Sequence, residues 1–98
     1  MAYKLVWSPT VRDDLHDIVV FIARHNPEQA MSFGFEVISA TDRLQDYPEE
    51  GRILPEYRRA DLREIILRPY RVVYRINHGR KLCEIVRVWH SARGTPVL

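Results

Sequence analysis

The sequence has little that would cross-link the chain or carry it into a membrane. Cys83 is the only cysteine among 98 residues, so no internal disulfide can form, and a lone thiol fits a reducing compartment. No apolar run approaches the roughly 18 residues of a membrane-spanning helix. The first residues, MAYKLVWSP, lack the apolar segment of a signal peptide. We expect one soluble cytoplasmic domain over residues 1–98.

Motifs for cofactors and metals are also missing. There is no Gly-rich phosphate loop and no cluster of Cys and His at metal-binding spacing. The four histidines, His16, His25, His78 and His90, are scattered along the chain. The sequence therefore predicts no cofactor and no metal site.

Lysine is scarce, whereas arginine is abundant and unevenly placed. Residues 1–48 hold four basic and seven acidic side chains, a net charge of −3. Residues 49–98 hold eleven basic and six acidic side chains, a net charge of +5, and ten of the eleven are arginines. Arginine is preferred where a planar fork must grip phosphate or carboxylate. The basic half therefore indicates an acidic partner, although local ion pairs on a solvated surface would give the same composition.

The first half of the chain predicts a strand and a helical hairpin. Residues 3–7 alternate as a short strand. Ser8 and Pro9 are typical of a helix start, and apolar residues then follow helical spacing to about residue 24. Asn26 and Pro27 start a second helix, which we expect to end near Asp46. Its predicted inner stripe includes Ile38. The short break between the helices predicts an antiparallel pair.

The second half predicts a sheet. Residues 48–61 form a long polar connection with two prolines, followed by strands at 62–67, 70–77 and 82–90. This order predicts an α+β domain in which an N-terminal strand and a helical hairpin precede a three-stranded antiparallel meander. The helices should cover one face of the sheet and leave the other open.

Strand alternation and a four-residue turn at 78–81 predict which arginines lie on the open face. Asn77 should then pair with Leu82, and Arg75 should lie opposite Glu84. Arg71, Arg75 and His90 fall on the open face, and Trp89 falls on the core face. We expect Arg71 to lack an acidic partner, so that Arg71→Ala costs little stability and Arg71 contacts something external.

Four segments together resemble a known family. They are WSPTVRDDLHDIVVFIARHNPEQA at 7–30, YPEEGR at 47–52, LREIILRPYRVVYRI at 62–76 and VRVWHSAR at 86–93. The pattern is similar to the RelE/ParE superfamily of toxins from bacterial type II toxin–antitoxin systems, some of which are described as plasmid stabilisation proteins. Within it, the chain most resembles the ParE branch. The resemblance implies the fold derived above.

The resemblance also implies partners and a function. A ParD-like or other small antitoxin would bind the toxin in a hetero-oligomeric complex and neutralise it. ParE-like members are expected to arrest growth by inhibiting DNA gyrase, through a surface rather than a catalytic set. Candidate target-binding residues are Arg63, Arg71, Arg75, His90 and Arg93. No residues are assigned to antitoxin binding.

RelE-like members instead imply an endoribonuclease that cleaves mRNA on the ribosome. That chemistry needs a base, an acid and a cation that stabilises the charge of the transition state. RelE-type sites are lysine-rich, and this chain has only Lys4 and Lys81. A glutamate–arginine–histidine set like that of some relatives could be supplied by Glu56, Arg71 and His90. A binding module without activity is the third reading.

Overall fold

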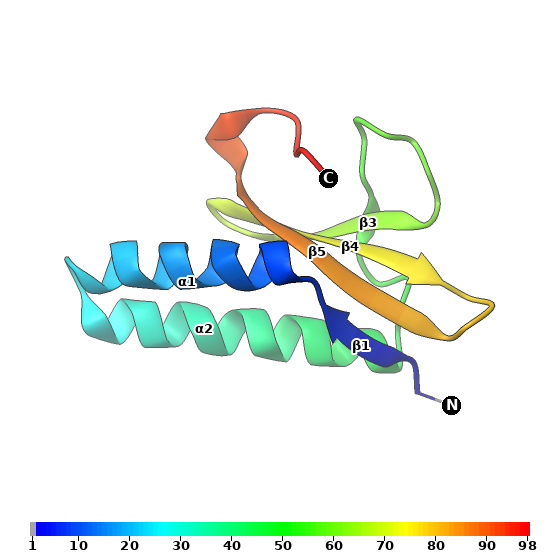
Figure 1. Ribbon diagram of the computed structural model, residues 1–98, viewed down its shortest axis with the longest axis horizontal. Helices are drawn as coiled ribbons and strands as arrows, with labels where there is room; N and C mark the ends of the chain where they lie inside the picture. Colours follow the sequence, from blue (N-terminus) through cyan, green and yellow to red (C-terminus); the bar gives the residue numbers. More distant parts are fainter. Residues whose placement is uncertain (1) are drawn as a thin grey trace.

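The computed structural model describes residues 2–98, which form two helices packed on a five-stranded sheet. The elements follow the predicted order (Figure 1). Their bounds are β1 Lys4–Trp7, α1 Pro9–Ala23, α2 Pro27–Asp42, β2 Arg52–Ile53, β3 Leu62–Leu67, β4 Tyr70–Asn77 and β5 Leu82–His90. The predicted α+β class is confirmed.

Side-chain caps fix the starts of both helices. The Ser8 hydroxyl accepts the backbone N–H of Val11 at 3.1 Å, and the Asn26 side chain accepts that of Gln29 at 3.1 Å. Each cap satisfies one of the amide groups that a helix start leaves unpaired. Pro9 and Pro27 follow as first helical residues, where no N–H is needed. A single 3-10 turn at Arg43–Gln45 extends α2 close to its predicted end.

The sheet has the order β1-β5-β4-β3-β2. The meander β3-β4-β5 is antiparallel, as predicted, while β1 pairs in parallel with β5 at one edge. The opposite edge holds β2, a two-residue strand within the segment that we expected to be a loop. Arg52 pairs there with Glu64, which ties the start of the long connection to the sheet.

A bulge in β5 changes which residues face the helices. The predicted pairs Asn77–Leu82 and Arg75–Glu84 are present, but Tyr74 pairs with Ile85 and Val73 with Arg87, so Val86 is an extra residue. A bulge shifts the alternation of every residue beyond it. The predicted faces of Trp89 and His90 are therefore wrong: Trp89 pairs with Arg71 and His90 with Tyr70.

The helix side of the sheet carries the main core. Its buried members include Val11, Phe33, Val37, Tyr74 and Val88, with α1 contributing half-buried residues along its inner face. The prediction that Ile38 belongs to the inner stripe of α2 is wrong, because Ile38 is 52% exposed. The apolar stripe is therefore narrower than the sequence pattern indicated.

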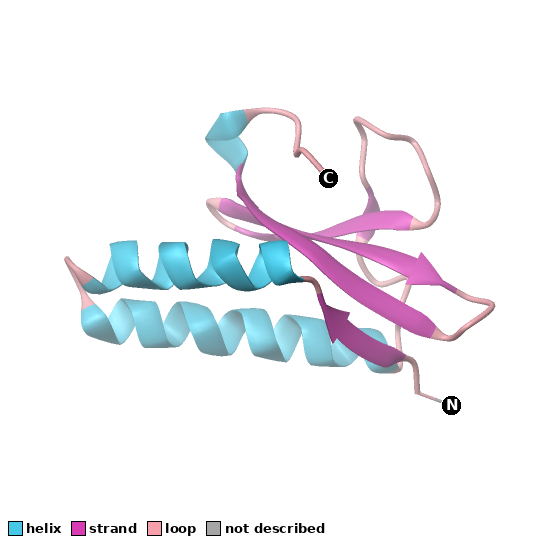
Figure 2. Cartoon of the chain, in the orientation of Figure 1, coloured by secondary structure: helices cyan, strands magenta, loops and turns pink. Residues whose placement is uncertain are grey.

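The face of the sheet opposite the helices is covered, not open. Leu54, Leu62, Val73 and Val86 form a second buried cluster there, with Tyr57 against it. The connection after β2 and the C-terminal segment both lie above the sheet in Figure 2, on the same side of it. The Tyr57 hydroxyl joins them by donating to the Pro96 carbonyl at 2.7 Å. Burying Leu54 anchors the connection with about 1.5–3 kcal/mol.

Candidate functional site

Arg71, on β4, lies at the centre of a network of ion pairs. Its Nε donates to Oε1 of Glu64 at 2.5 Å, and its two terminal nitrogens donate to the two carboxylate oxygens of Glu56 at 2.8 and 2.7 Å. Nη1 also contacts the Gly94 carbonyl at 3.4 Å. Arg71 therefore joins strand β3, the connection after β2 and the C-terminal segment.

Glu64 links this network to the sheet edge. Its carboxylate is fully buried, and its second oxygen, Oε2, accepts Arg52 Nε at 2.6 Å. A buried carboxylate is costly unless both oxygens have charged or hydrogen-bonding partners. Two guanidinium groups, from β2 and β4, meet that need.

The network favours the charged forms of Glu56 and Arg71. The hydrogen bonds from Arg71 lower the pKa of Glu56 below its usual range, more than burial raises it. The hydrogen bonds from Glu56, and then from Glu64, raise the pKa of Arg71 above its usual range, against the effect of burial. The expectation that Arg71 lacks an acidic partner is wrong, because its side chain is only 9% exposed and its guanidinium has two carboxylate partners.

Arg63 also serves the fold. Its guanidinium donates to the Ala60, Glu49 and Gly51 carbonyls at 3.0–3.2 Å and lies 3.3 Å from the Glu49 carboxylate. These partners come from both ends of the connection between α2 and β3. Arg63 pairs with Tyr74 of the helix-side core, so it lies on the face opposite Arg71.

Arg75 lies where the register predicted. Its Nη1 is 3.3 Å from Oε1 of Glu84, and both side chains are more than a third exposed. An exposed pair of this kind contributes at most about 1 kcal/mol. Part of the Arg75 guanidinium stays accessible to a partner.

His90 lies away from Arg71, because the bulge turns it to the helix side. Its ring packs edge-on against Tyr70, with centroids 5.2 Å apart, and Tyr70 belongs to the helix-side core. Its Nδ1 accepts the N–H of Ala92 at 3.0 Å and so caps the 3-10 turn Ser91–Arg93. The candidate nuclease set is divided: Glu56 and Arg71 meet, whereas His90 faces the other way.

Arg93 is exposed and stacks on Trp89. Its guanidinium carbon lies 3.8 Å from the centre of the indole ring, and that of Arg87 lies at 4.8 Å. The Trp89 Nε1–H donates to the Gly94 carbonyl at 3.1 Å, which fixes the ring. Of the five predicted target-binding residues, His90 and Arg93 line one pocket, and the other three lie elsewhere.

Two structural carboxylates escaped the sequence analysis. Glu64 lies diagonally across from Arg71 in the β3–β4 pair, and diagonal neighbours on one face can interact. A predicted two-residue turn at Arg68–Pro69 would have fixed the β3–β4 register, and that register brings Glu64 close to Arg71. Asp14 accepts Arg87 with both oxygens and also the Val88 N–H. No sequence pattern pointed to that long-range contact.

Within residues 2–98, no three His, Cys, Asp or Glu side chains are grouped so that they could hold a metal ion. Neither α1 nor α2, the helices of this part of the chain, is long and apolar enough to cross a bilayer.

Comparisons with known proteins agree with this architecture. The family model described as "ParE toxin of type II toxin-antitoxin system, parDE" matches residues 5–94. Toxin RelE2 of Caulobacter vibrioides is 34% identical over 91 residues, covering 92% of this chain and 97% of that protein.

Two solved structures are similar along almost their whole length. The chromosomal ParDE system of P. aeruginosa aligns with a TM-score of 0.73 at 21% identity, over 91% of this chain and 96% of that one. The RelBE2 toxin–antitoxin complex of Mycobacterium tuberculosis aligns with a TM-score of 0.62 at 27% identity, over 92% and 99%. The family-model match and the C. vibrioides relative show that this chain belongs to the ParE/RelE family and is the toxin of a type II toxin–antitoxin system.

Proposed function

We propose that this toxin arrests growth by inhibiting DNA gyrase, as the ParE branch is expected to do. The match of the ParE family model to residues 5–94 carries the proposal. An inhibitor of this kind needs a binding surface and no catalytic set.

The Arg71 network supports binding over RNA cleavage. A nuclease needs a cation whose donors can reach the charge that develops in the transition state. The Arg71 donors are engaged by Glu64 and Glu56. His90, the candidate acid or base, lies on the other face of the sheet beside Tyr70.

Expression in cells separates the two mechanisms. Gyrase inhibition should switch on a DNA-damage reporter soon after induction of the toxin. Primer extension on abundant mRNAs should show no new codon-positioned ends. Codon-positioned cuts with a silent reporter would reject the proposal.

The second candidate function is cleavage of mRNA on the ribosome. The observation that favours it is the 34% identity to a protein named Toxin RelE2. Under this function, Glu56 would have to leave Arg71 when the ribosome binds. Purified toxin should then cut mRNA only in the presence of ribosomes, and Glu56→Gln and His90→Ala should abolish cutting. A chain that does neither would be the inactive binding module.

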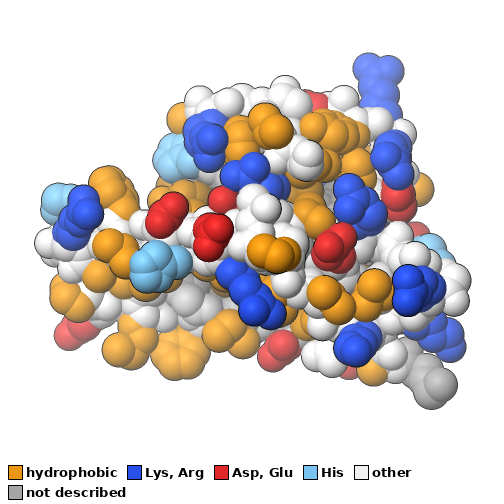
Figure 3. Space-filling view, viewed as in Figure 1, with side chains coloured by type: hydrophobic (Ala, Val, Ile, Leu, Met, Phe, Trp, Pro, Cys, Tyr) orange, Lys and Arg blue, Asp and Glu red, His pale blue; other side chains and the backbone are white. Residues whose placement is uncertain are grey.

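We also propose that a cognate antitoxin neutralises the toxin, because solved relatives are toxin–antitoxin complexes. The candidate binding surface is an exposed apolar stripe on α2. Met31 and Phe35 are 65% and 63% exposed there, and Ile38 lies on the same stripe. Hydrophobic side chains gather along the lower left edge of the molecule, over α2 (Figure 3). A contiguous exposed apolar patch of this kind marks an interaction site.

Calorimetric titration with the antitoxin tail tests this surface. Phe35→Ser should weaken binding, whereas Ser32→Ala, one turn away on α2, should not. An acidic tail should also associate more slowly at high salt, because residues 49–98 are basic. Unchanged affinity of Phe35→Ser would place the antitoxin elsewhere.

A further inference from the structure

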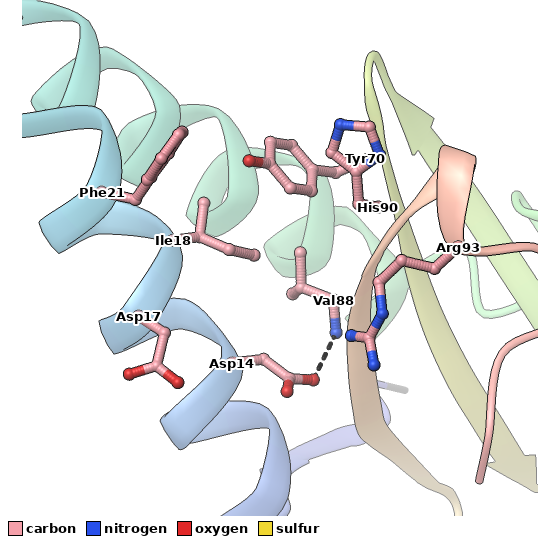
Figure 4. Close-up of a pocket in the computed structure, with 8 residues that line it drawn as sticks. All are labelled: Asp14, Asp17, Ile18, Phe21, Tyr70, Val88, His90 and Arg93. Carbon is pink, nitrogen blue, oxygen red and sulfur yellow. Dashed lines mark hydrogen bonds between the residues drawn. The ribbon is translucent and has the colours of Figure 1, made fainter. Parts of the chain in front are cut away.

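A small pocket lies where α1 passes the end of β5, on the side of the sheet away from Arg71 (Figure 4). Its volume is about 250 Å³. Strand β1 ends at Trp7, opposite Ile85, so the remainder of β5 is flanked by α1 instead of a strand. The Asp14 carboxylate accepts the Val88 N–H at 3.0 Å, and both residues line the bottom of the pocket. The pocket is below the roughly 300–1,000 Å³ of sites for drug-sized ligands, so it suits a single ring system.

The walls of this α1–β5 pocket are flat and apolar. Tyr70 and His90 meet edge-to-face on one side, and Ile18 and Phe21 of α1 form the other. Phe21 is 57% exposed at the rim, where a large aromatic side chain gains little from folding. Tyr70 is buried, at 8% exposure, so the accessible aromatic surface belongs to Phe21 and the half-buried His90. Unstacked nucleobases bind on accessible aromatic surfaces of this kind.

The polar groups stand at two separate places around these walls. Asp17 projects from α1, and Arg93 projects from the 3-10 turn after β5 (Figure 4). Both residues are exposed, so a ligand can reach their charged groups. The stacking of Arg93 on Trp89, at 3.8 Å, holds its guanidinium in place and leaves its N–H donors available.

These features define the ligand by its chemistry. It needs an aromatic ring, N–H donors for Asp17 on one edge and a negative charge for Arg93 on another. A cationic side chain from a protein would satisfy Asp17 but would be repelled by Arg93. The base edge of guanine offers two neighbouring N–H donors to one carboxylate, and its phosphate suits an arginine fork.

His90 adds a donor to this set. Because Nδ1 accepts the Ala92 N–H, the neutral imidazole carries its proton on Nε2. That N–H can donate to a carbonyl oxygen of a bound base. The ring therefore supplies both a stacking surface and a hydrogen bond.

We propose that the α1–β5 pocket binds an unpaired guanine nucleotide of a nucleic acid, with the base on Asp17 and its phosphate on Arg93. Residues 49–98, which supply His90 and Arg93 to the pocket, carry a net charge of +5 and favour a polyanion on that side. The α1 side comes from residues 1–48, with a net charge of −3, and would contact the base and not the phosphate. The inference goes beyond gyrase inhibition and does not depend on it, because both gyrase-bound DNA and ribosomal complexes contain nucleic acid.

Fluorescence anisotropy with the full chain tests the proposal. The probes are a labelled short oligothymidylate and the same strand with one central guanine, each prepared as DNA and as RNA. The guanine strand should bind roughly tenfold more tightly, the scale of one bidentate base contact. The DNA and RNA forms identify which nucleic acid the pocket prefers.

Matched variants assign the contacts. Asp17→Asn should remove the guanine preference and leave oligothymidylate binding unchanged, whereas Asp13→Asn, an exposed neighbour on α1, should change neither. Arg93→Ala should weaken both strands alike and lower the salt dependence by about one phosphate contact. Arg80→Ala, in the exposed turn before β5, is its charge-matched control.

Three results would overturn the proposal: equal affinity for the two strands, no binding to either at low salt, or a guanine preference that survives Asp17→Asn. An Asp17→Asn variant that loses affinity only for the antitoxin tail would assign the pocket to a protein partner instead. Melting temperatures of the variants show that each is folded, and none of these readouts requires gyrase.

Discussion

Glu64 and Arg71 form a buried ion pair on the face of the sheet opposite the helices, here called the far face. Oε1 of Glu64 lies 2.5 Å from Arg71 Nε, and the carboxylate is fully buried. Breaking such a pair from one side leaves an uncompensated buried charge, which costs more than the pair contributes when intact. Arg71, which the sequence predicted to be free to contact a target, therefore stabilises the fold.

Arg71→Ala should destabilise the fold by about 3–5 kcal/mol, because Glu64 would keep only the exposed Arg52 as a partner. Urea unfolding measures this. Arg75→Ala is the control, and its exposed pair with Glu84 predicts a loss of at most about 1 kcal/mol. If both variants were equally stable, the buried network would not hold this face together.

Removal of the Glu56 charge should have an effect that depends on pH. The pKa of Glu56 is lowered in the folded state from 4.5, so its stabilisation is present above pH 4.5 and is lost as pH falls through the lower folded value. Glu56→Gln should therefore be less stable than the parent chain at pH 7, by about 1 kcal/mol. The gap should close in acid. A gap that is constant from neutral to acidic pH would contradict this assignment.

Asp14→Asn should cost about 2 kcal/mol, the scale of hydrogen bonds to a charged group. The carboxylate binds Arg87 at 2.8 and 3.0 Å. It also accepts the N–H of Val88, beyond the part of β5 that pairs with β1. Asp13→Asn is the neighbouring control and should change stability by less than about 0.5 kcal/mol. Thermal melts of both variants compare them. Equal melting temperatures would show that Asp14 does not join α1 to β5.

Two glycines should respond oppositely to alanine. At Gly51, an added Cβ would lie 2.7 Å from both the Glu64 carbonyl and the Tyr74 hydroxyl, so Gly51→Ala should destabilise by about 1–3 kcal/mol. At Gly34, inside α2, nothing beyond the adjacent residues and the helix's own nearby backbone lies within 4 Å of that position, and Gly34→Ala should stabilise by up to about 1 kcal/mol. Denaturant midpoints of the two variants measure whether each substitution lowers or raises stability. A stable Gly51→Ala would show that the close approach of Tyr74 can relax.

Local signals in the sequence predicted the local structure well. Ser8–Pro9 and Asn26–Pro27 gave the helix starts, because the caps depend on neighbouring residues alone. The turn between β4 and β5 gave the register up to Tyr74. The family resemblance gave the superfamily from motifs spread over nearly the whole chain.

Non-local features were missed. No glycine marks the bulge at Val86, so its effect on Trp89 and His90 could not be foreseen. The cover over the far face depends on contacts such as Tyr57 with Pro96, between segments far apart in the chain. Strand alternation placed Arg71 on the correct face, but only the packed structure shows that Glu56 and Glu64 occupy its donors.

Inhibition of gyrase is tested most directly with purified components. Toxin is added to gyrase, ATP and relaxed plasmid, with and without the antitoxin, and supercoiling is followed on a gel. Gyrase inhibition should appear as loss of supercoiling or accumulation of cleaved plasmid, and the antitoxin should reverse it. Full supercoiling at excess toxin, from a sample that cuts mRNA on translating ribosomes, would contradict it.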